Sequence, residues 1–269
     1  MRSRKNICNN IEFVQTNENN TDVYRSRNFI KESCMQQVSN PFQAMKDIFV
    51  KPNQVFATIS DTHNWSWIPF ICIAILGVMP IYMYFNFVDF AWYTELMVQA
   101  MAGDLSPAEQ NVFRNLMSDQ AQSLWAGVFG SVFMLLISNG ILALYLNIVT
   151  KADEECVQGY TDWYGFSWWV SIPVIVSSLI GILIVLMAQD NQLPPISIAP
   201  TSLGFIFSVE MNSSWASLMQ SIRLESIWVM YLTAVGLSQW TQLPTKKTYL
   251  IAIAPYVLFW AVWVFIILL

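Results

Sequence analysis

Five long apolar runs dominate the sequence from Trp67 to its last residue. A helix crosses the roughly 30 Å hydrocarbon core of a bilayer with about 20 apolar residues, and each run is close to that length. Because lipid offers the backbone no hydrogen bonds, such a run favours a helix. The sequence therefore predicts an all-α integral membrane protein, a bundle of five transmembrane helices. The predicted spans are residues 67–88, 124–149, 168–188, 222–240 and 249–269.

The fourth predicted span begins beside two charged residues, Arg223 and Glu225, so its apolar part can start as late as Ser226. The central parts of the five runs contain no Asp, Glu, Lys, Arg or His. Ionisable side chains at membrane depth usually mark proton relays or ion paths. Their absence from these positions argues against a proton-coupled transporter or pump.

The composition agrees with a chain whose solvent is largely lipid. Hydrophobic residues make up 55% of the 269 residues and charged residues 12%, about half the charged share of a soluble domain. The net charge of −5 argues against nucleic acid as a partner, since phosphate binding needs a basic surface. Cys8, Cys34, Cys72 and Cys156 show no metal-ligand or Cys-x-x-Cys spacing, so we expect free thiols.

Lys and Arg are unevenly distributed over the predicted connections, and their distribution sets the expected orientation. With the N-terminus in the cytoplasm, eleven of the 13 basic residues fall on cytoplasmic segments, including Lys151, Lys246 and Lys247. Arg114 and Arg223 alone fall on the other side. An odd number of spans then places the C-terminus on the far side of the membrane.

The first 39 residues are polar and rich in Asn, so we expect a disordered cytoplasmic tail (1–39) ahead of a membrane domain (40–269). No apolar segment of signal-peptide length precedes the first run, so we expect that run to act as the targeting element and to stay in the protein. We further hypothesise that Met35 is the natural start and that the preceding residues are an upstream extension.

Residues 40–60 have the pattern of one or two short amphipathic helices. Asn40 can cap a helix that starts with Pro41, and Lys51 followed by Pro52 would end it. Neither helix can cross a bilayer, so we expect both to lie in the cytoplasmic interface with their apolar faces on lipid. The alternative is an ordinary helix that packs on the loops.

Helices are also expected in the two longer outside connections, 89–123 and 190–221. Ser106, Pro107 and Glu109 have the order of an N-cap, a first-turn proline and an acidic first turn. They predict a helix that continues into the second span. Residues 215–222 have the alternation of an amphipathic helix that lies on a surface.

Polar residues inside the apolar runs are the candidates for a binding site. One interpretation is a polar pocket or substrate path. The other, which we favour, is hydrogen bonding between helices, worth about 0.6 kcal/mol each. Small residues four apart, such as Ser177 and Gly181, similarly predict close helix packing. The candidate binding residues are Ser138, Asn139 and Asn147, with Ser171, Ser177 and Ser178 in the next run.

No catalytic motif is present: the sequence lacks G-x-S-x-G, H-E-x-x-H and P-loop patterns. Asp61 and His63 are a pair only, which is too few ligands for a metal site. The acidic run from Asp153 to Glu155 is interpreted as a solvated loop. We therefore predict no enzymatic activity, no cofactor and no metal.

Two stretches have a recognisable pattern, Ile48 to Phe56 and Ile227 to Ser238, the second followed by a basic turn. Together they resemble the Yip-type, Rab-GTPase-interacting-like family of five-span membrane domains, in its bacterial branch. The resemblance implies a bundle without known enzymatic activity in the bacterial inner membrane, with a cytoplasmic N-terminus and a periplasmic C-terminus. The residues that carry the motif, and that we take as partner or topology determinants, are Lys51, Pro52, Trp228, Lys246 and Lys247.

The leading functional hypothesis is a non-enzymatic accessory or assembly protein that associates with another membrane complex. The resemblance suggests an ABC-type exporter or its adaptor as the partner, because some similar bacterial proteins occur beside such exporters. The alternative is a channel or facilitator for a small solute, lined by Ser138, Asn139 and Asn147.

Overall fold

The computed structural model describes residues 38–62 and 64–269, and this part of the chain is helical throughout apart from its connections. The expectations for residues 1–37 and His63 lie outside it. The elements of the first half are α3 (Pro41–Asp47), α4 (Pro52–Ile59), α5 (Trp67–Phe87), α6 (Phe90–Ala102) and α7 (Pro107–Leu116). Then come α8 (Gln120–Val149), η2 (Thr150–Ala152), α9 (Tyr160–Val170) and α10 (Val174–Met187). The last are η3 (Pro195–Ile198), α11 (Leu203–Ile206), α12 (Ala216–Ser221), α13 (Leu224–Trp240) and α14 (Thr245–Leu268).

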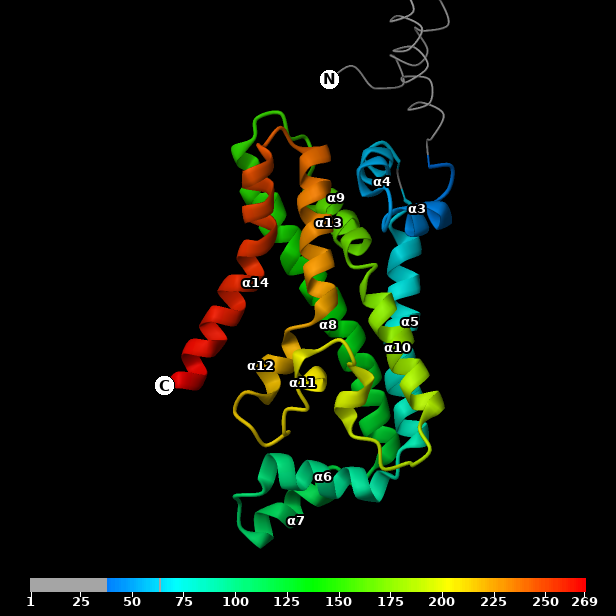
Figure 1. Ribbon diagram of the computed structural model, residues 1–269, viewed down its shortest axis with the longest axis vertical. Helices are drawn as coiled ribbons and strands as arrows, with labels where there is room; N and C mark the ends of the chain where they lie inside the picture. Colours follow the sequence, from blue (N-terminus) through cyan, green and yellow to red (C-terminus); the bar gives the residue numbers. More distant parts are fainter. Residues whose placement is uncertain (1–37, 63) are drawn as a thin grey trace, which may run out of the picture.

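The long helices run along one axis of an elongated bundle (Figure 1). The helices α3 and α4 lie at its upper end in that view, and α6 and α7 lie across its lower end. The closest helix pairs are α5 with α10 and α8 with α9, while α13 packs on α14 and α4. Upper end and lower end are used below in this sense.

Four helical segments are long and apolar enough to cross a membrane. They are Trp67–Phe87, Gln120–Ala152, Tyr160–Met187 and Thr245–Leu268. The predicted span 222–240 corresponds to α13, which has 17 residues and is shorter than the other four. The protein is therefore a multi-pass, all-helical membrane protein with four candidate spans in the described residues.

Two predicted helix boundaries differ from the structure. The helix that begins after Ser106 ends at Leu116 and does not continue into the second span. A new helix, α8, starts at Gln120, where the Asp119 side chain accepts a hydrogen bond from the Gln122 backbone N–H (3.1 Å). The cap separates the two helices because it satisfies the free N–H groups that a continuous helix would not have.

The start of the third span also differs from the prediction. The helix α9 begins at Tyr160, eight residues before the predicted start. The Gly159 backbone N–H donates to the Asp162 carboxylate (2.8 Å) and closes the first turn. The first turn of this helix contains polar residues, so a search for apolar runs placed its start too late.

The N-terminal helices form as their caps predict. The Asn40 side chain accepts from the Gln43 N–H (2.8 Å), and the chain breaks before Pro52. The apolar side chains of α4, including Val55 and Phe56, are fully buried within the protein, where α4 packs on α13. The prediction that the apolar face of this helix lies on lipid is therefore wrong, because α13 covers that face. The helix α3 keeps Phe42 exposed.

The upper core forms where α4, α9 and α13 meet, at Gly236 of α13. A Cβ at this position would lie 2.2 Å from Cε2 of Phe166 and 3.1 Å from Cδ1 of Phe56. The two rings lie 5.1 Å apart, and Phe166 also contacts Trp163 and Trp240. A residue without a side chain therefore lets three helices close around a cluster of aromatic rings.

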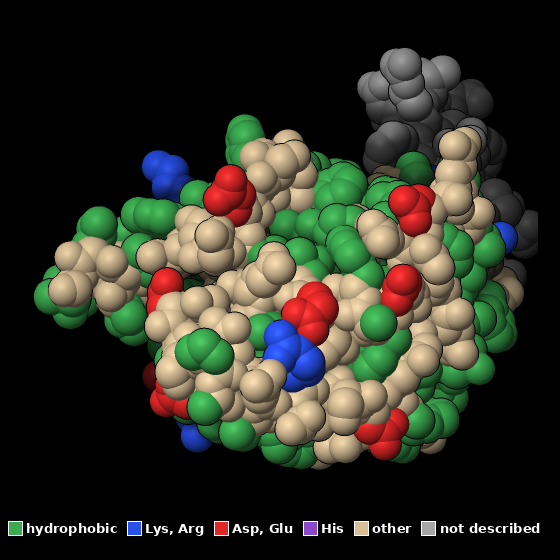
Figure 2. Space-filling view, turned by 90° about the horizontal axis from the view of Figure 1, so that it is seen from below, with side chains coloured by type: hydrophobic (Ala, Val, Ile, Leu, Met, Phe, Trp, Pro, Cys, Tyr) green, Lys and Arg blue, Asp and Glu red, His purple; other side chains and the backbone are tan. Residues whose placement is uncertain are grey.

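The lower end carries a polar cap of short helices. Figure 2 shows it from below: acidic side chains are spread over the face, with fewer basic ones. The Arg114 guanidinium of α7 binds the Glu95 carboxylate of α6, with Nη2 to Oε2 at 3.0 Å. The Tyr84 hydroxyl of α5 donates to the Leu193 carbonyl (2.9 Å), which ties the connection after α10 to the bundle.

Candidate functional site

The connection between α10 and α13 is the least regular part of the described bundle. In Figure 1 the segment η3–α11–α12 lies above the α6–α7 layer, and η3 packs on α10 and α5. It approaches α10 very closely, because a Cβ on Gly181 would lie 2.9 Å from the Ile198 carbonyl oxygen. Gly181 therefore packs against the 3-10 helix η3, whereas its spacing from Ser177 predicted packing against another helix.

The segment is joined to the start of α13 through its backbone. The Leu203 N–H donates to the Ile222 carbonyl (2.9 Å), and the Leu224 N–H donates to the Thr201 carbonyl (3.0 Å). Ser202 is fully buried; its hydroxyl donates to the Ala199 carbonyl (2.7 Å). These bonds satisfy backbone groups that would otherwise be exposed to lipid.

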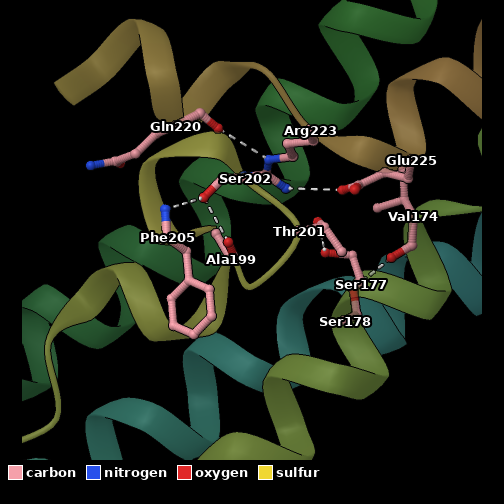
Figure 3. Close-up of polar contacts among 10 residues, drawn as sticks. All are labelled: Val174, Ser177, Ser178, Ala199, Thr201, Ser202, Phe205, Gln220, Arg223 and Glu225. Atoms are coloured by element: carbon pink, nitrogen blue, oxygen red, sulfur yellow. Dashed lines mark hydrogen bonds and ion pairs between the residues drawn. The ribbon is translucent and has the colours of Figure 1, made fainter. Parts of the chain in front are cut away.

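The start of α13 is placed beside the middle of the third span by one side-chain contact. The hydroxyls of Ser177 and Thr201 lie 2.7 Å apart (Figure 3). Ser177 stands in the first turn of α10, close to the middle of the span Tyr160–Met187. Because Thr201 also holds Leu224, the first turn of α13 lies at the depth of this pair rather than at the lower end.

Glu225 therefore stands beside the middle of the third span. Its side chain is 7% exposed, and neither carboxylate oxygen has a hydrogen-bond partner among the described residues. The nearest cation is Arg223, whose Nη1 lies 3.8 Å from Oε1 and whose side chain is 42% exposed (Figure 3). A carboxylate in the first turn of a helix is favoured by the helix dipole, but its burial is costly without hydrogen bonds.

This placement differs from the sequence analysis, which put Arg223 and Glu225 at the outer end of the fourth run. The predicted apolar run from Ser226 onward is helical in the structure, as expected. What differs is the depth at which α13 starts, because η3, α11 and α12 take up space beside the spans. Intramembrane carboxylates usually mark functional sites, and breaks in helices near the membrane midplane form binding sites in many transporters.

The three polar residues predicted in the second run do not lie together. Asn139 is buried, and its Oδ1 accepts from the Ser171 hydroxyl (3.1 Å) where the chain bends between α9 and α10. Ser138 is exposed, and its hydroxyl donates to the Leu135 carbonyl of its own helix. Asn147 is half-buried near the upper end of α8.

The predicted partner and topology residues lie mainly at the upper end. Lys51 is exposed and precedes α4, while Pro52 is buried at its first position. Lys246 and Lys247 are exposed in the first turn of α14. Trp228 lies on α13 with its ring 5.4 Å from that of Tyr231, and 40% of the residue is exposed.

Two features of the structure were not predicted from the sequence, the Thr201–Glu225 break and a bend in α14 (Figure 1). Pro255 has no N–H for the Ile251 carbonyl, and the Tyr145 hydroxyl of α8 donates to that carbonyl instead (2.9 Å). The proline inside the last apolar run could have predicted the bend. The hydroxyl that compensates for it could not be predicted, since Tyr145 lies 106 residues from Ile251 in the chain.

No group of three His, Cys, Asp or Glu that could hold a metal ion occurs within residues 38–62 and 64–269. The carboxylate of Glu225 and the nearby hydroxyls can accept or donate hydrogen bonds at membrane depth. These groups can therefore bind a polar ligand or a neighbouring helix.

Four apolar candidate spans and a polar break beside them define a multi-pass helical membrane protein. More specifically, the chain belongs to the Yip1 domain family, whose model matches residues 46–266. This family is not known for enzymatic activity. No curated protein and no solved structure matches the chain.

Proposed function

We propose that this chain is a non-enzymatic membrane protein that associates with another membrane complex through the lower half of α14. The supporting observation is the built-in bend of that helix at Pro255. Above it, Thr248, Ile251 and Ala252 are buried against the bundle. Below it, the helix leans away from the other spans (Figure 1).

The lower half of α14 exposes a long apolar face. Large side chains such as Phe259, Val262 and Phe265 are each more than half exposed. Only 11% of the apolar window of α14 is buried, against 39% for the span formed by α9 and α10. Lipid tails are as apolar as these side chains, so association in lipid would depend on van der Waals packing of this face against a partner of matching shape.

Photo-crosslinking in native membranes distinguishes a protein partner from lipid. A photoreactive residue at Phe259 is expected to capture another polypeptide, whereas one at Phe133 of α8, equally apolar and 63% exposed, is expected to capture lipid. Pro255→Ala, which restores the missing backbone donor, should reduce capture at Phe259 while the protein stays folded. Capture of lipid alone at both positions would reject the proposal.

The partner class we propose is an ABC-type exporter or its adaptor. Mass spectrometry of the crosslinked product identifies the captured chain. Recovery of a second copy of this protein, or of an unrelated membrane protein, would contradict the exporter assignment. It would still support the lower half of α14 as the contact surface.

We further propose five spans in a bacterial inner membrane, with α13 as the fourth and the upper end in the cytoplasm. The 17 residues of α13 extend about 25 Å at 1.5 Å per residue, from the depth of Ser177 to the upper end. The segment η3–α11–α12 would complete this crossing from the lower side. Outside the break, most of the described basic residues lie at the upper end, including Lys151, Lys246 and Lys247, whereas Arg114 lies at the lower end. This distribution favours a cytoplasmic upper end. On this orientation α3 would rest its exposed Phe42 on the cytoplasmic interface.

Cysteine labelling tests the orientation. In intact cells, an impermeant maleimide is expected to label none of the native cysteines, and to label a cysteine added after Leu269. Lys151→Cys, an exposed position in the α8–α9 connection, should react only after permeabilisation. Labelling of Cys156 or of Lys151→Cys in intact cells would reverse the topology.

A channel or facilitator is the second candidate, and the buried Glu225 beside Thr201 favours it. The liposome-reconstituted protein would then pass a small polar solute. Glu225→Gln should reduce the flux, and so should Asn139→Leu if the predicted residues Ser138, Asn139 and Asn147 line the same route. Absence of flux for ions and small polar solutes would reject this function.

A further inference from the structure

A cavity of about 660 Å³ opens at the upper end of the bundle, between the α4–α5 connection, α9 and the start of α5. Its volume lies within the range of about 300–1,000 Å³ that ligand pockets occupy. It reaches from polar residues such as Gln158, in the connection before α9, to Leu136 in the middle of α8. The cavity therefore extends from interface level into the apolar layer.

One wall of the cavity is a continuous row of aromatic rings. Trp67 contacts Phe70 edge-to-face at 5.6 Å, Phe70 contacts Trp168 at 4.8 Å, and Trp168 contacts Tyr164 at 5.8 Å. Trp240 also lines the cavity, and its Nε1 donates to the Phe56 carbonyl (2.9 Å). Interlocked rings keep their shape without a ligand, so the surface is preorganised.

The described residues that line the cavity carry a single carboxylate. Among its described lining residues, Asp162 is the one acidic residue, and none is Lys or Arg. Asp162 is exposed in the first turn of α9, where it also accepts from the Gly159 N–H. A carboxylate combined with aromatic faces recognises an ammonium group. The hydroxyl of Ser66 and the amide of Asn64 can donate to an adjacent phosphate.

We propose that this cavity binds one phospholipid whose headgroup carries an ammonium, of the phosphatidylethanolamine type. The ammonium would lie against Asp162, and one acyl chain would follow the aromatic row toward Leu136. The polar residues at interface level and the apolar ones deeper match the two parts of such a molecule. This site is separate from the face of α14 and from the break at Glu225.

Native mass spectrometry of the full chain in mild detergent tests the assignment. Phosphatidylethanolamine is expected to bind about tenfold more tightly than phosphatidylglycerol, a difference of about 1.4 kcal/mol. Phosphatidylglycerol has the phosphate and acyl chains without the ammonium. Soluble phosphoethanolamine, which has the headgroup alone, is expected to bind far more weakly than either lipid, because the aromatic row binds the chain.

Asp162→Asn is the decisive variant, since its Oδ1 can still accept from Gly159 while the charge is removed. It should abolish the preference for phosphatidylethanolamine without lowering the Tm. Glu154→Gln, an exposed acidic position in the same connection and outside the cavity, should keep the preference. Trp67→Leu changes an exposed ring of the wall and should weaken both lipids together.

Three results would overturn the proposal: equal binding of the two lipids to the unaltered protein, an unchanged preference in Asp162→Asn, or loss of preference in Glu154→Gln. Should Asp162→Asn fold poorly, quenching of tryptophan fluorescence by bromine-labelled acyl chains in the unaltered protein still decides. Equal quenching by brominated phosphatidylethanolamine and brominated phosphatidylglycerol, each at trace amounts in vesicles of unbrominated phosphatidylglycerol, would contradict a specific site. That bulk lipid carries no ammonium and so cannot compete through the headgroup.

Discussion

The upper core and the polar break are held together by different kinds of contact. At the upper core, Phe56 and Phe166 close on Gly236, and shape decides how α4, α9 and α13 fit. At the break, Thr201 joins η3 to α10 and α13 through one hydroxyl contact and one backbone bond. Packing of rings is intolerant of added volume, whereas a membrane hydrogen bond contributes modestly.

The difference between the two regions predicts where the fold is rigid and where it can change. The upper core carries the cavity and would hold its shape with or without a lipid. The break contains Glu225, whose oxygens have no described hydrogen-bond partner. A region with unsatisfied groups is the one in which a ligand or partner can gain most by binding.

The largest expected effect is at Gly236. Gly236→Ala places a Cβ 2.2 Å from Phe166, so overpacking should cost about 1–3 kcal/mol and lower the Tm by roughly 2–12 °C. The control is Gly130→Ala on α8, where an added Cβ meets nothing within 4 Å and helix propensity improves. Thermal unfolding in detergent measures both. Equal Tm values for Gly236→Ala and Gly130→Ala would show that steric fit at Gly236 does not limit the stability of the upper core.

The next effect is at the ion pair of the break. Arg223→Ala leaves the Glu225 carboxylate buried without a nearby cation and should cost about 1–2 kcal/mol. Adding Glu225→Gln to that variant removes the charge and should restore most of the stability. Denaturant unfolding of the single and double variants measures this recovery, and additive losses would show that the two residues act independently.

A smaller effect is expected for the hydroxyl pair. Ser177→Ala and Thr201→Val should show a coupling of about 0.6 kcal/mol in a double-mutant cycle, the average for a hydrogen bond between helices in lipid. Ser138→Ala, whose hydroxyl bonds only within its own helix, should show no coupling to Thr201→Val. A zero coupling for Ser177 and Thr201 would mean that packing alone holds η3 on α10.

The smallest effect concerns pH at the exposed lower end. The hydrogen bond from Arg114 holds the pKa of the Glu95 carboxyl below its usual value. Stability from this contact is present above the ordinary Glu pKa and is lost as pH falls through the lowered value. The protection factors of the α7 amides, which correct the measured exchange rates for intrinsic exchange at each pH, should therefore fall on acidification.

Glu95→Gln provides the control for this pH effect. The pKa of Glu109 is also lowered, by its hydrogen bonds to Ser106, and its protonation loosens the same helix. The Glu95→Gln variant keeps that second contribution, so the difference between the two proteins isolates the Glu95–Arg114 pair. Identical pH profiles would show that the pair contributes nothing to the packing of α6 on α7.

Local signals in the sequence predicted the elements that local chemistry forms. The caps at Asn40 and Ser106 and the break before Pro52 are present as expected. Apolar length located the four candidate spans, because backbone satisfaction in lipid depends on the segment itself. The family resemblance, taken from Lys51–Pro52 and the turn at Lys246, was confirmed by the match to the Yip1 domain.

The tertiary structure decided how deep α13 starts and where the last span leaves the bundle. The depth of Glu225 follows from the Thr201–Ser177 contact, and the bend at Pro255 is completed by Tyr145. Both depend on residues more than 20 positions apart, which no local pattern encodes. The aromatic cavity likewise forms only when Phe70 and Trp168 meet across two helices. The sequence alone therefore determines that the chain resides in a membrane. The break, the bend and the cavity depend on how the helices pack against one another.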